Sequence, residues 1–172
     1  MQELILGGVK SGKSRYAENQ AKHTNQAVVY LATATADDAE MQQRIRQHQT
    51  HRPKDWALVE APLQLAEHIQ RIDQQAHGNV CILVECLTLW MTNVLTQAAP
   101  QLTQEVQALL ALLPHSQADI LLVSNETNMG IVPLDALSRR YCDEMGRLHQ
   151  ALAVLCDKVT LVVAGLPLTV KG

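Results

Sequence analysis

The sequence predicts one α/β domain of three layers, in which a mostly parallel sheet is flanked by helices. Two observations lead to this prediction. Short, nearly continuous apolar runs alternate with amphipathic stretches along the whole chain, which is typical of buried parallel strands joined by helices. The chain also has 172 residues, 47% of them hydrophobic and 18% charged, which is enough to bury the core of one domain. Because no repeat or linker interrupts the pattern, we expect residues 1–172 to form a single domain.

Five apolar runs rich in Val, Ile and Leu are the predicted strands. They cover residues 4–6, 28–31, 80–84, 120–124 and 159–163. Runs without alternating polar residues are expected where helices cover both faces of a sheet. Residues 56–60 predict a further, weaker strand.

Amphipathic stretches between these runs predict the helices. They cover residues 15–22, 35–51, 102–113 and 134–155. Thr35 and Asp38 resemble a capping box at the start of the second stretch. In the last two stretches, apolar residues recur at helical spacing. Pro62 and Pro133 occupy positions expected of prolines in the first turn of a helix.

Composition and charge exclude several classes of protein. The chain has 14 Lys and Arg against 17 Asp and Glu and only 3% aromatic residues, so we expect no binding to nucleic acid. No apolar run is long enough to span a bilayer, and the N-terminus enters the first strand without a leader, which predicts a cytoplasmic protein. The four cysteines lack metal-site spacing and are expected to be buried, reduced thiols.

The first strand leads into a segment that matches the phosphate-loop pattern G-x-x-x-x-G-K-[ST] without a mismatch. Its residues are Gly7, Gly8, Val9, Lys10, Ser11, Gly12, Lys13 and Ser14. Glycines permit the tight turn, and consecutive amides at a helix N-terminus face phosphate oxygens. Lys13 reaches the outer phosphates, and Ser14 can ligate Mg²⁺. We therefore expect a fold of the P-loop NTPase (RecA-like) type that binds a nucleoside triphosphate.

A carboxylate that helps to hold Mg²⁺ is expected at the end of a neighbouring strand. Glu85 follows the run 80–84 and fits this role, although an ordinary strand-end carboxylate is the alternative. A signalling GTPase is not favoured, because residues 124–127 lack the Lys and Asp of the Asn-Lys-x-Asp motif that reads guanine. The Asp-x-x-Gly match at residues 143–146 lies inside the helix predicted over residues 134–155 and therefore cannot be a switch loop.

A second informative region contains Arg44, His48 and Arg52, which are spaced by four and share one face of a helix. Two guanidinium groups disfavour protonation of the imidazole between them, and neutral imidazole is the nucleophilic form. The same arginines could hold phosphate oxygens. Taken alone, the region favours a solvated polar helix with incidental histidines over a catalytic site. Five other histidines are assigned to solvated faces or caps, namely His23, His68, His77, His115 and His149.

With these two regions, the sequence resembles the bifunctional adenosylcobinamide kinase/adenosylcobinamide-phosphate guanylyltransferase family of cobalamin biosynthesis. Five segments carry the resemblance, at residues 7–15, 30–34, 44–56, 83–93 and 123–133. The first is generic to phosphate-loop proteins. The histidine segment and the segment Asn125-Glu126-x-x-Met129-Gly130-Ile131-Val132-Pro133 are far more specific.

The resemblance implies two reactions. First, ATP or GTP phosphorylates adenosylcobinamide. Then a histidine, which corresponds to His48, takes GMP from GTP and passes it to adenosylcobinamide phosphate, so His48 and Lys13 are the implied catalytic residues. The implied nucleotide contacts beyond the phosphate loop are Ala32, Thr33, Ala34, Gln49, Thr50, His51, Arg52, Glu60 and Glu85. Ser14 and Glu85 would hold Mg²⁺, and the resemblance also points to a homo-oligomer, a trimer.

Two positions depart from the family pattern. Ala34 stands where a serine is expected, and Gln47 stands where some members carry a second histidine. His48 therefore remains the expected nucleophile, with His51 as the alternative. Two other functions stay open: a small-metabolite kinase without guanylyl transfer, and a regulator that binds nucleotide without catalysis.

Overall fold

Seven strands form one sheet in the order β3-β2-β4-β5-β1-β6-β7 in the computed structural model, which describes residues 1–35, 53 and 55–172. The strands are β1 (Gln2–Gly7), β2 (Ala27–Ala32), β3 (Ala57–Glu60), β4 (Val80–Glu85), β5 (Asp119–Asn125), β6 (Lys158–Val163) and β7 (Leu166–Lys171). Every neighbouring pair is parallel except β6 and β7, which are antiparallel. The mostly parallel sheet and the weaker strand at residues 57–60 confirm the predictions.

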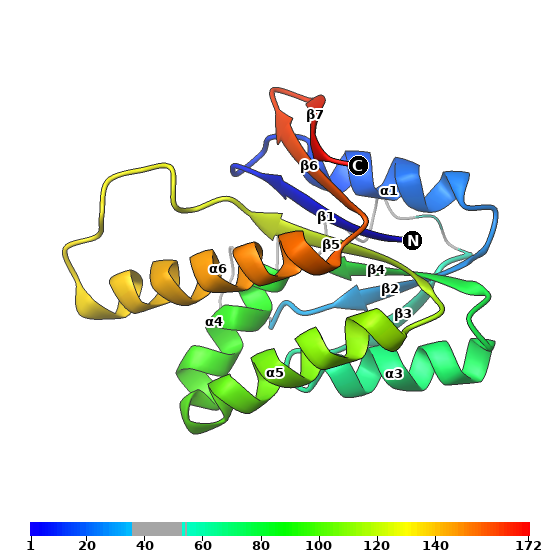
Figure 1. The fold of residues 1–172 in the computed structure, drawn as a ribbon, viewed down its shortest axis with the longest axis horizontal. Helices are drawn as coiled ribbons and strands as arrows, with labels where there is room; N and C mark the ends of the chain where they lie inside the picture. Colours follow the sequence, from blue (N-terminus) through cyan, green and yellow to red (C-terminus); the bar gives the residue numbers. More distant parts are fainter. Residues whose placement is uncertain (36–52, 54) are drawn as a thin grey trace.

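Helices cover both faces of this sheet, as Figure 1 shows. They are α1 (Lys13–His23), α3 (Leu65–Ala76), α4 (Leu87–Gln97), α5 (Leu102–Leu112) and α6 (Ala136–Leu155), with short 3₁₀ segments at Ala99–Gln101 and Leu113–His115. Helix α1 packs on one face, and α3 to α6 pack on the other. Within the described residues, every helix is too short or too polar to cross a lipid bilayer.

The central strands bury side chains on both faces, which explains their continuous apolar sequence. On β5, Ile120 and Leu122 pack in the cluster shared with α3 to α6. Leu121 and Val123 pack in the cluster shared with α1. Because side chains alternate along a strand, this register also settles which face each polar residue at the end of the strand occupies.

Several elements differ from the sequence predictions. Pro62 and Pro133 lie three residues before the helices that start at Leu65 and Ala136, so neither is in a first turn. Asp135 caps α6 instead, accepting a hydrogen bond from the Ser138 amide at 2.8 Å. The helix predicted over residues 35–51 lies outside the described residues.

Three elements, α3, α4 and β7, were not predicted as ranges from the sequence, and only Pro62 indicated α3. Helix α4 is buried on most of its surface, so its sequence lacks the polar face that identifies an amphipathic helix. Strand β7 is exposed along its whole length at the edge of the sheet. Neither α4 nor β7 therefore carries the pattern used for the other elements.

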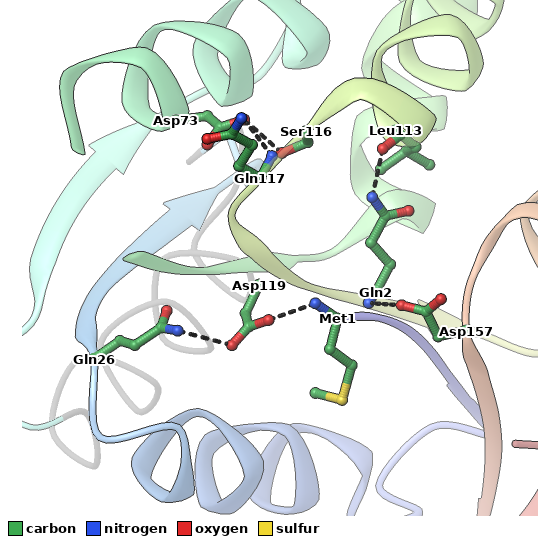
Figure 2. Close-up of polar contacts among 9 residues, drawn as sticks. All are labelled: Met1, Gln2, Gln26, Asp73, Leu113, Ser116, Gln117, Asp119 and Asp157. Atoms are coloured by element: carbon green, nitrogen blue, oxygen red, sulfur yellow. Dashed lines mark hydrogen bonds and ion pairs between the residues drawn. The ribbon is translucent and has the colours of Figure 1, made fainter. Parts of the chain in front are cut away.

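The amino-terminal edge of the sheet is held by polar contacts between segments that are distant in sequence (Figure 2). Asp119 accepts from the N-terminal ammonium at 2.5 Å and from Gln26 at 3.0 Å. Asp73 accepts from the Ser116 hydroxyl at 2.7 Å and the Gln117 amide at 3.0 Å. The loops that follow the carboxyl ends of the parallel strands, including the loop after β1, lie at the opposite end of the sheet.

Candidate active site

The loop between β1 and α1 can be built only with glycine at two positions. A Cβ atom on Gly7 would lie 2.6 Å from the Val162 carbonyl oxygen and would also collide with the Ser11 hydroxyl. Gly12 has a φ of 96°, and a Cβ there would lie 3.0 Å from the Gly165 Cα. Both positions need glycine because backbone approaches where a side chain would project.

The turn between β6 and β7 supports this loop from the side. The Gly165 amide donates to the Ser11 carbonyl at 2.8 Å. Ala164 and Gly165 have φ values of 51° and 81°, as a two-residue hairpin turn of type I′ requires. Sequence reasoning missed this contact, although a glycine-containing pair between two β-rich runs is a hairpin signal.

The loop presents its backbone to solvent directly before the first turn of α1. Gly8, Val9 and Lys10 are exposed, and the Ser11 amide donates to the Gly8 carbonyl at 3.1 Å. Lys13 is 8% exposed, and its Nζ donates to the Gly8 carbonyl at 3.3 Å. A tight turn, a helix N-terminus and a lysine that folds over the turn are the features that bind phosphate groups.

Glu85 and Ser14 meet beside this loop. The Ser14 hydroxyl donates to Glu85 Oε1 at 2.7 Å. Burial raises the pKa of Glu85 to about 7, against the opposing effects of the Ser14 hydrogen bond and the positive charge of Lys13. Carboxylate and hydroxyl oxygens are ligands that Mg²⁺ accepts, so this pair fits a magnesium site.

Three of the predicted nucleotide contacts stand in a row across neighbouring strands. Ala32 is in register with Glu60 on one side and with Glu85 on the other. Ala32 packs against the cluster that contains α1, so all three residues belong to the face that carries the phosphate loop. Glu60 is exposed at the end of β3.

Thr33 differs from its neighbours because its side chain is fully buried. Its hydroxyl donates to the Cys86 carbonyl and accepts from the Cys86 amide, both at 2.8 Å. Thr33 therefore joins the ends of β2 and β4, and the half-buried Ala34 follows it. The predicted site residues His48, Gln49, Thr50, His51 and Arg52, together with Arg44, lie outside the described residues.

His149 contradicts its assignment to a solvated face. It is 7% exposed, and its Nε2 lies 2.8 Å from the Ser124 hydroxyl. It lies four residues after Met145 and three before Leu152, on the buried stripe of α6, which is the signal that could have placed it. Of the other four, His23, His77 and His115 are exposed and His68 is partly buried.

Two further sequence inferences can be compared with the structure. Residues 143–146 lie within α6, as predicted, and cannot form a switch loop. Cys81, Cys86 and Cys156 are buried free thiols, whereas Cys142 is only partly buried. Among the described residues, no group of His, Cys, Asp and Glu side chains could hold a metal ion by itself.

Comparison with known proteins identifies the family of this chain. A family model described as cobinamide kinase / cobinamide phosphate guanyltransferase matches residues 3–170. The chain belongs to this family. It is 51% identical over 173 residues to the bifunctional adenosylcobalamin biosynthesis protein CobP of Pseudomonas aeruginosa, covering 100% of this chain and 98% of the relative. It is 36% identical over 189 residues to the CobU protein of Escherichia coli, covering 99% and 100%.

Solved structures that resemble this family member show the fold alone. A KaiC-like protein from Pyrococcus horikoshii has a TM-score of 0.53 at 11% identity, covering 93% of this chain and 69% of that protein. The P4 protein of bacteriophage phi6, solved with ADP, has a TM-score of 0.50 at 13% identity, covering 97% and 53%. The fold is that of P-loop NTPases, as predicted.

Proposed function

We propose that this protein phosphorylates adenosylcobinamide with ATP or GTP and then transfers GMP from GTP to the phosphorylated product, giving adenosyl-GDP-cobinamide. The match of residues 3–170 to the cobinamide kinase / cobinamide phosphate guanyltransferase family carries the proposal. Its relatives of similar length are named bifunctional adenosylcobalamin biosynthesis proteins. The phosphate loop and the Ser14–Glu85 pair supply the local chemistry.

In the kinase step, the loop amides and Lys13 hold the triphosphate while a substrate hydroxyl attacks the terminal phosphorus. The bond from that phosphorus to the bridging oxygen breaks, the nucleoside diphosphate leaves, and the hydroxyl proton is released. Catalysis of this reaction consists mostly of positioning and charge neutralisation. Lys13 is suited to this role because its buried stem holds the ammonium group over the loop.

Ser14 and Glu85 would hold Mg²⁺ with the triphosphate. When bound, the ion neutralises phosphate charge. The raised pKa of Glu85 reflects burial, and a nearby cation would favour its ionised form.

In the guanylyltransferase step, His48 would attack the α-phosphorus of GTP and release pyrophosphate. The resulting bond between ring nitrogen and phosphorus then breaks when a phosphate oxygen of adenosylcobinamide phosphate attacks, which regenerates the histidine. Gln49, Thr50, His51, Arg52 and Glu60, with Ala32, Thr33 and Ala34, are the proposed nucleotide contacts. With aromatic residues at 3%, we expect polar and backbone contacts to hold the guanine.

The proposal includes the setting of the enzyme. We expect a homo-oligomer, a trimer, that works in the cytoplasm, where ATP and GTP are available, and that does not bind nucleic acid. The net charge of −3 supports the last point.

Covalent labelling tests the histidine intermediate. The protein is incubated with Mg²⁺ and GTP labelled at the α-phosphate, with γ-labelled GTP as the control. We expect label from the α-position alone, stable to base and labile to acid, as a phosphorus–nitrogen bond requires. The label should be lost in His48→Ala and kept in His51→Ala.

The other outcomes separate the alternative functions. If the wild-type protein phosphorylates adenosylcobinamide but takes up no α-label, it is a kinase without guanylyl transfer. Nucleotide binding without any corrinoid product would indicate a regulator.

A further inference from the structure

The end of β5 carries a polar segment to which the proposed reactions assign no role. Strand β5 lies between β1 and β4, so its end stands between the phosphate loop and Glu85. Asn125 is in register with Gly7, and Val123 is in register with Glu85. Leu121 and Val123 face the cluster that contains α1, so Asn125, two residues further on, belongs to the same face as the loop.

Asn125 therefore ends its strand beside the place where the triphosphate would lie. Asn125 is half-buried, and no hydrogen bond joins its side-chain amide to another residue in the part of the chain described here. An amide nitrogen at this position is a donor suited to phosphate oxygens.

The residues on either side of Asn125 face the other way and are held by one ring. Ser124 is fully buried, and its hydroxyl lies 2.8 Å from His149 Nε2. The Nδ1 atom of the same ring lies 3.8 Å from Glu126 Oε2. The other oxygen of Glu126 accepts from the Asn128 amide at 2.6 Å.

The backbone of the same segment is tied to the phosphate loop. The Glu126 amide donates to the carbonyl of Gly7, the first residue of the loop, at 3.0 Å. His149 thus contacts both neighbours of Asn125, and one of those neighbours contacts the loop. Burial lowers the pKa of His149, with Glu126 acting against this, so the ring is held chiefly as a neutral group.

We propose that Asn125 contacts the phosphate groups during phosphoryl transfer and that His149 is a positioning residue, which fixes Asn125 and the start of the loop through Ser124 and Glu126. This inference rests on the proposed kinase activity. It assigns a role to part of the Asn-Glu segment that carries the family resemblance. Small displacements of a group aligned with a reacting phosphate lower the rate of the reaction. A residue behind the site can therefore affect catalysis.

The test measures transfer of the γ-phosphate of ATP or GTP, whichever the wild-type protein uses, to adenosylcobinamide by the full-length protein. Asn125→Asp keeps the size of the side chain but replaces the amide donor with a negative charge, and we expect kcat to fall about 100-fold. His149→Phe keeps a ring but loses both nitrogens, and we expect kcat to fall about tenfold with KM values within about twofold of wild type. His149→Gln restores a polar group toward Ser124 and should recover most of that loss.

Leu152→Ala is the matched control. Leu152 is a buried residue of α6, as His149 is, but its aliphatic side chain can form no hydrogen bond with Ser124 or Glu126. It should lower thermal stability while leaving kcat near the wild-type value below the unfolding transition.

Three results would overturn the inference while leaving the kinase activity established. They are an unchanged kcat in Asn125→Asp, an unchanged kcat in His149→Phe, and an equal loss in Leu152→Ala. If His149→Phe does not fold, the kcat of Asn125→Asp relative to that of the wild type decides whether Asn125 acts as proposed. A wild-type protein that does not phosphorylate adenosylcobinamide would instead overturn the proposed function and this inference with it.

Discussion

At the scale of single residues, the phosphate loop depends on features that a pattern match does not distinguish. Gly7 and Gly8 are adjacent and both belong to the motif, yet their surroundings differ. A Cβ on Gly7 would meet Ser11 and the Val162 carbonyl, whereas one on Gly8 would meet nothing within 4 Å. The structure therefore separates a glycine needed for folding from one needed only where a ligand approaches.

Gly7→Ala should consequently destabilise the protein, by about 1–3 kcal/mol, because backbone would have to move. Gly8→Ala should leave the free energy of unfolding near the wild-type value. Chemical denaturation without nucleotide measures both. Equal stability of the two variants would contradict the packing described for Gly7.

Lys13 combines a charge with a buried stem, so two substitutions should behave differently. Lys13→Met keeps most of the stem and should weaken triphosphate binding with little loss of stability. Lys13→Ala should weaken binding similarly and also lower the melting temperature, because Lys13 is 8% exposed. Titration calorimetry with ATP, followed by thermal unfolding, checks this. Unchanged ATP affinity in Lys13→Met would contradict the assignment of the loop.

Glu85 should make stability depend on pH in the absence of nucleotide. Burial raises its pKa from the usual 4.5 to about 7, so the folded state holds a proton that the unfolded state has released. The free energy of unfolding should therefore fall as pH rises from about 4.5 to about 7, by up to about 3 kcal/mol for this group. Glu85→Gln should remove the fall, whereas Glu67→Gln, at an exposed position on α3, should keep it. If the free energy of unfolding depended on pH in the same way in Glu85→Gln as in the wild type, the raised pKa of Glu85 would be contradicted.

At the scale of elements, the hairpin of β6 and β7 acts as a support for the loop. The Gly165 amide in the turn of this hairpin donates to the Ser11 carbonyl of the loop. The hairpin reaches the loop because β6 pairs with β1, which leads into it. Figure 1 shows β6 beside β1, with β7 at the edge of the sheet. The hairpin thus connects the stability of a peripheral strand to the geometry of the site.

Gly165→Ala should therefore affect both stability and binding. A φ of 81° disfavours alanine, so we expect a loss of about 1 kcal/mol together with weaker ATP binding. Ala164→Gly is the matched control, because Ala164 has a φ of 51° and glycine relieves it. Denaturation and ATP titration of the two variants measure the effect. Full ATP affinity in Gly165→Ala would show that the hairpin does not support the loop.

At the scale of the whole molecule, most strands and the phosphate loop follow from the sequence, because buried parallel strands and loops that approach phosphate leave few choices of residue. Glu85 was predictable as a residue at the end of a buried strand. The proposed roles of Asn125 and His149 were not, because they depend on strand order and on which helix packs behind β5. Strand β7 was missed because it is exposed throughout, so burial leaves no pattern in its sequence.

One small protein is proposed to carry out two transfers at one edge of a sheet, and analysis of the product tests this most directly. Purified protein is incubated with adenosylcobinamide, Mg²⁺, ATP and GTP, and the corrinoids are separated and identified by mass spectrometry. We predict that adenosylcobinamide phosphate appears first and is converted to adenosyl-GDP-cobinamide, with release of pyrophosphate. Accumulation of the phosphate alone, or no change in the corrinoid, would contradict the account.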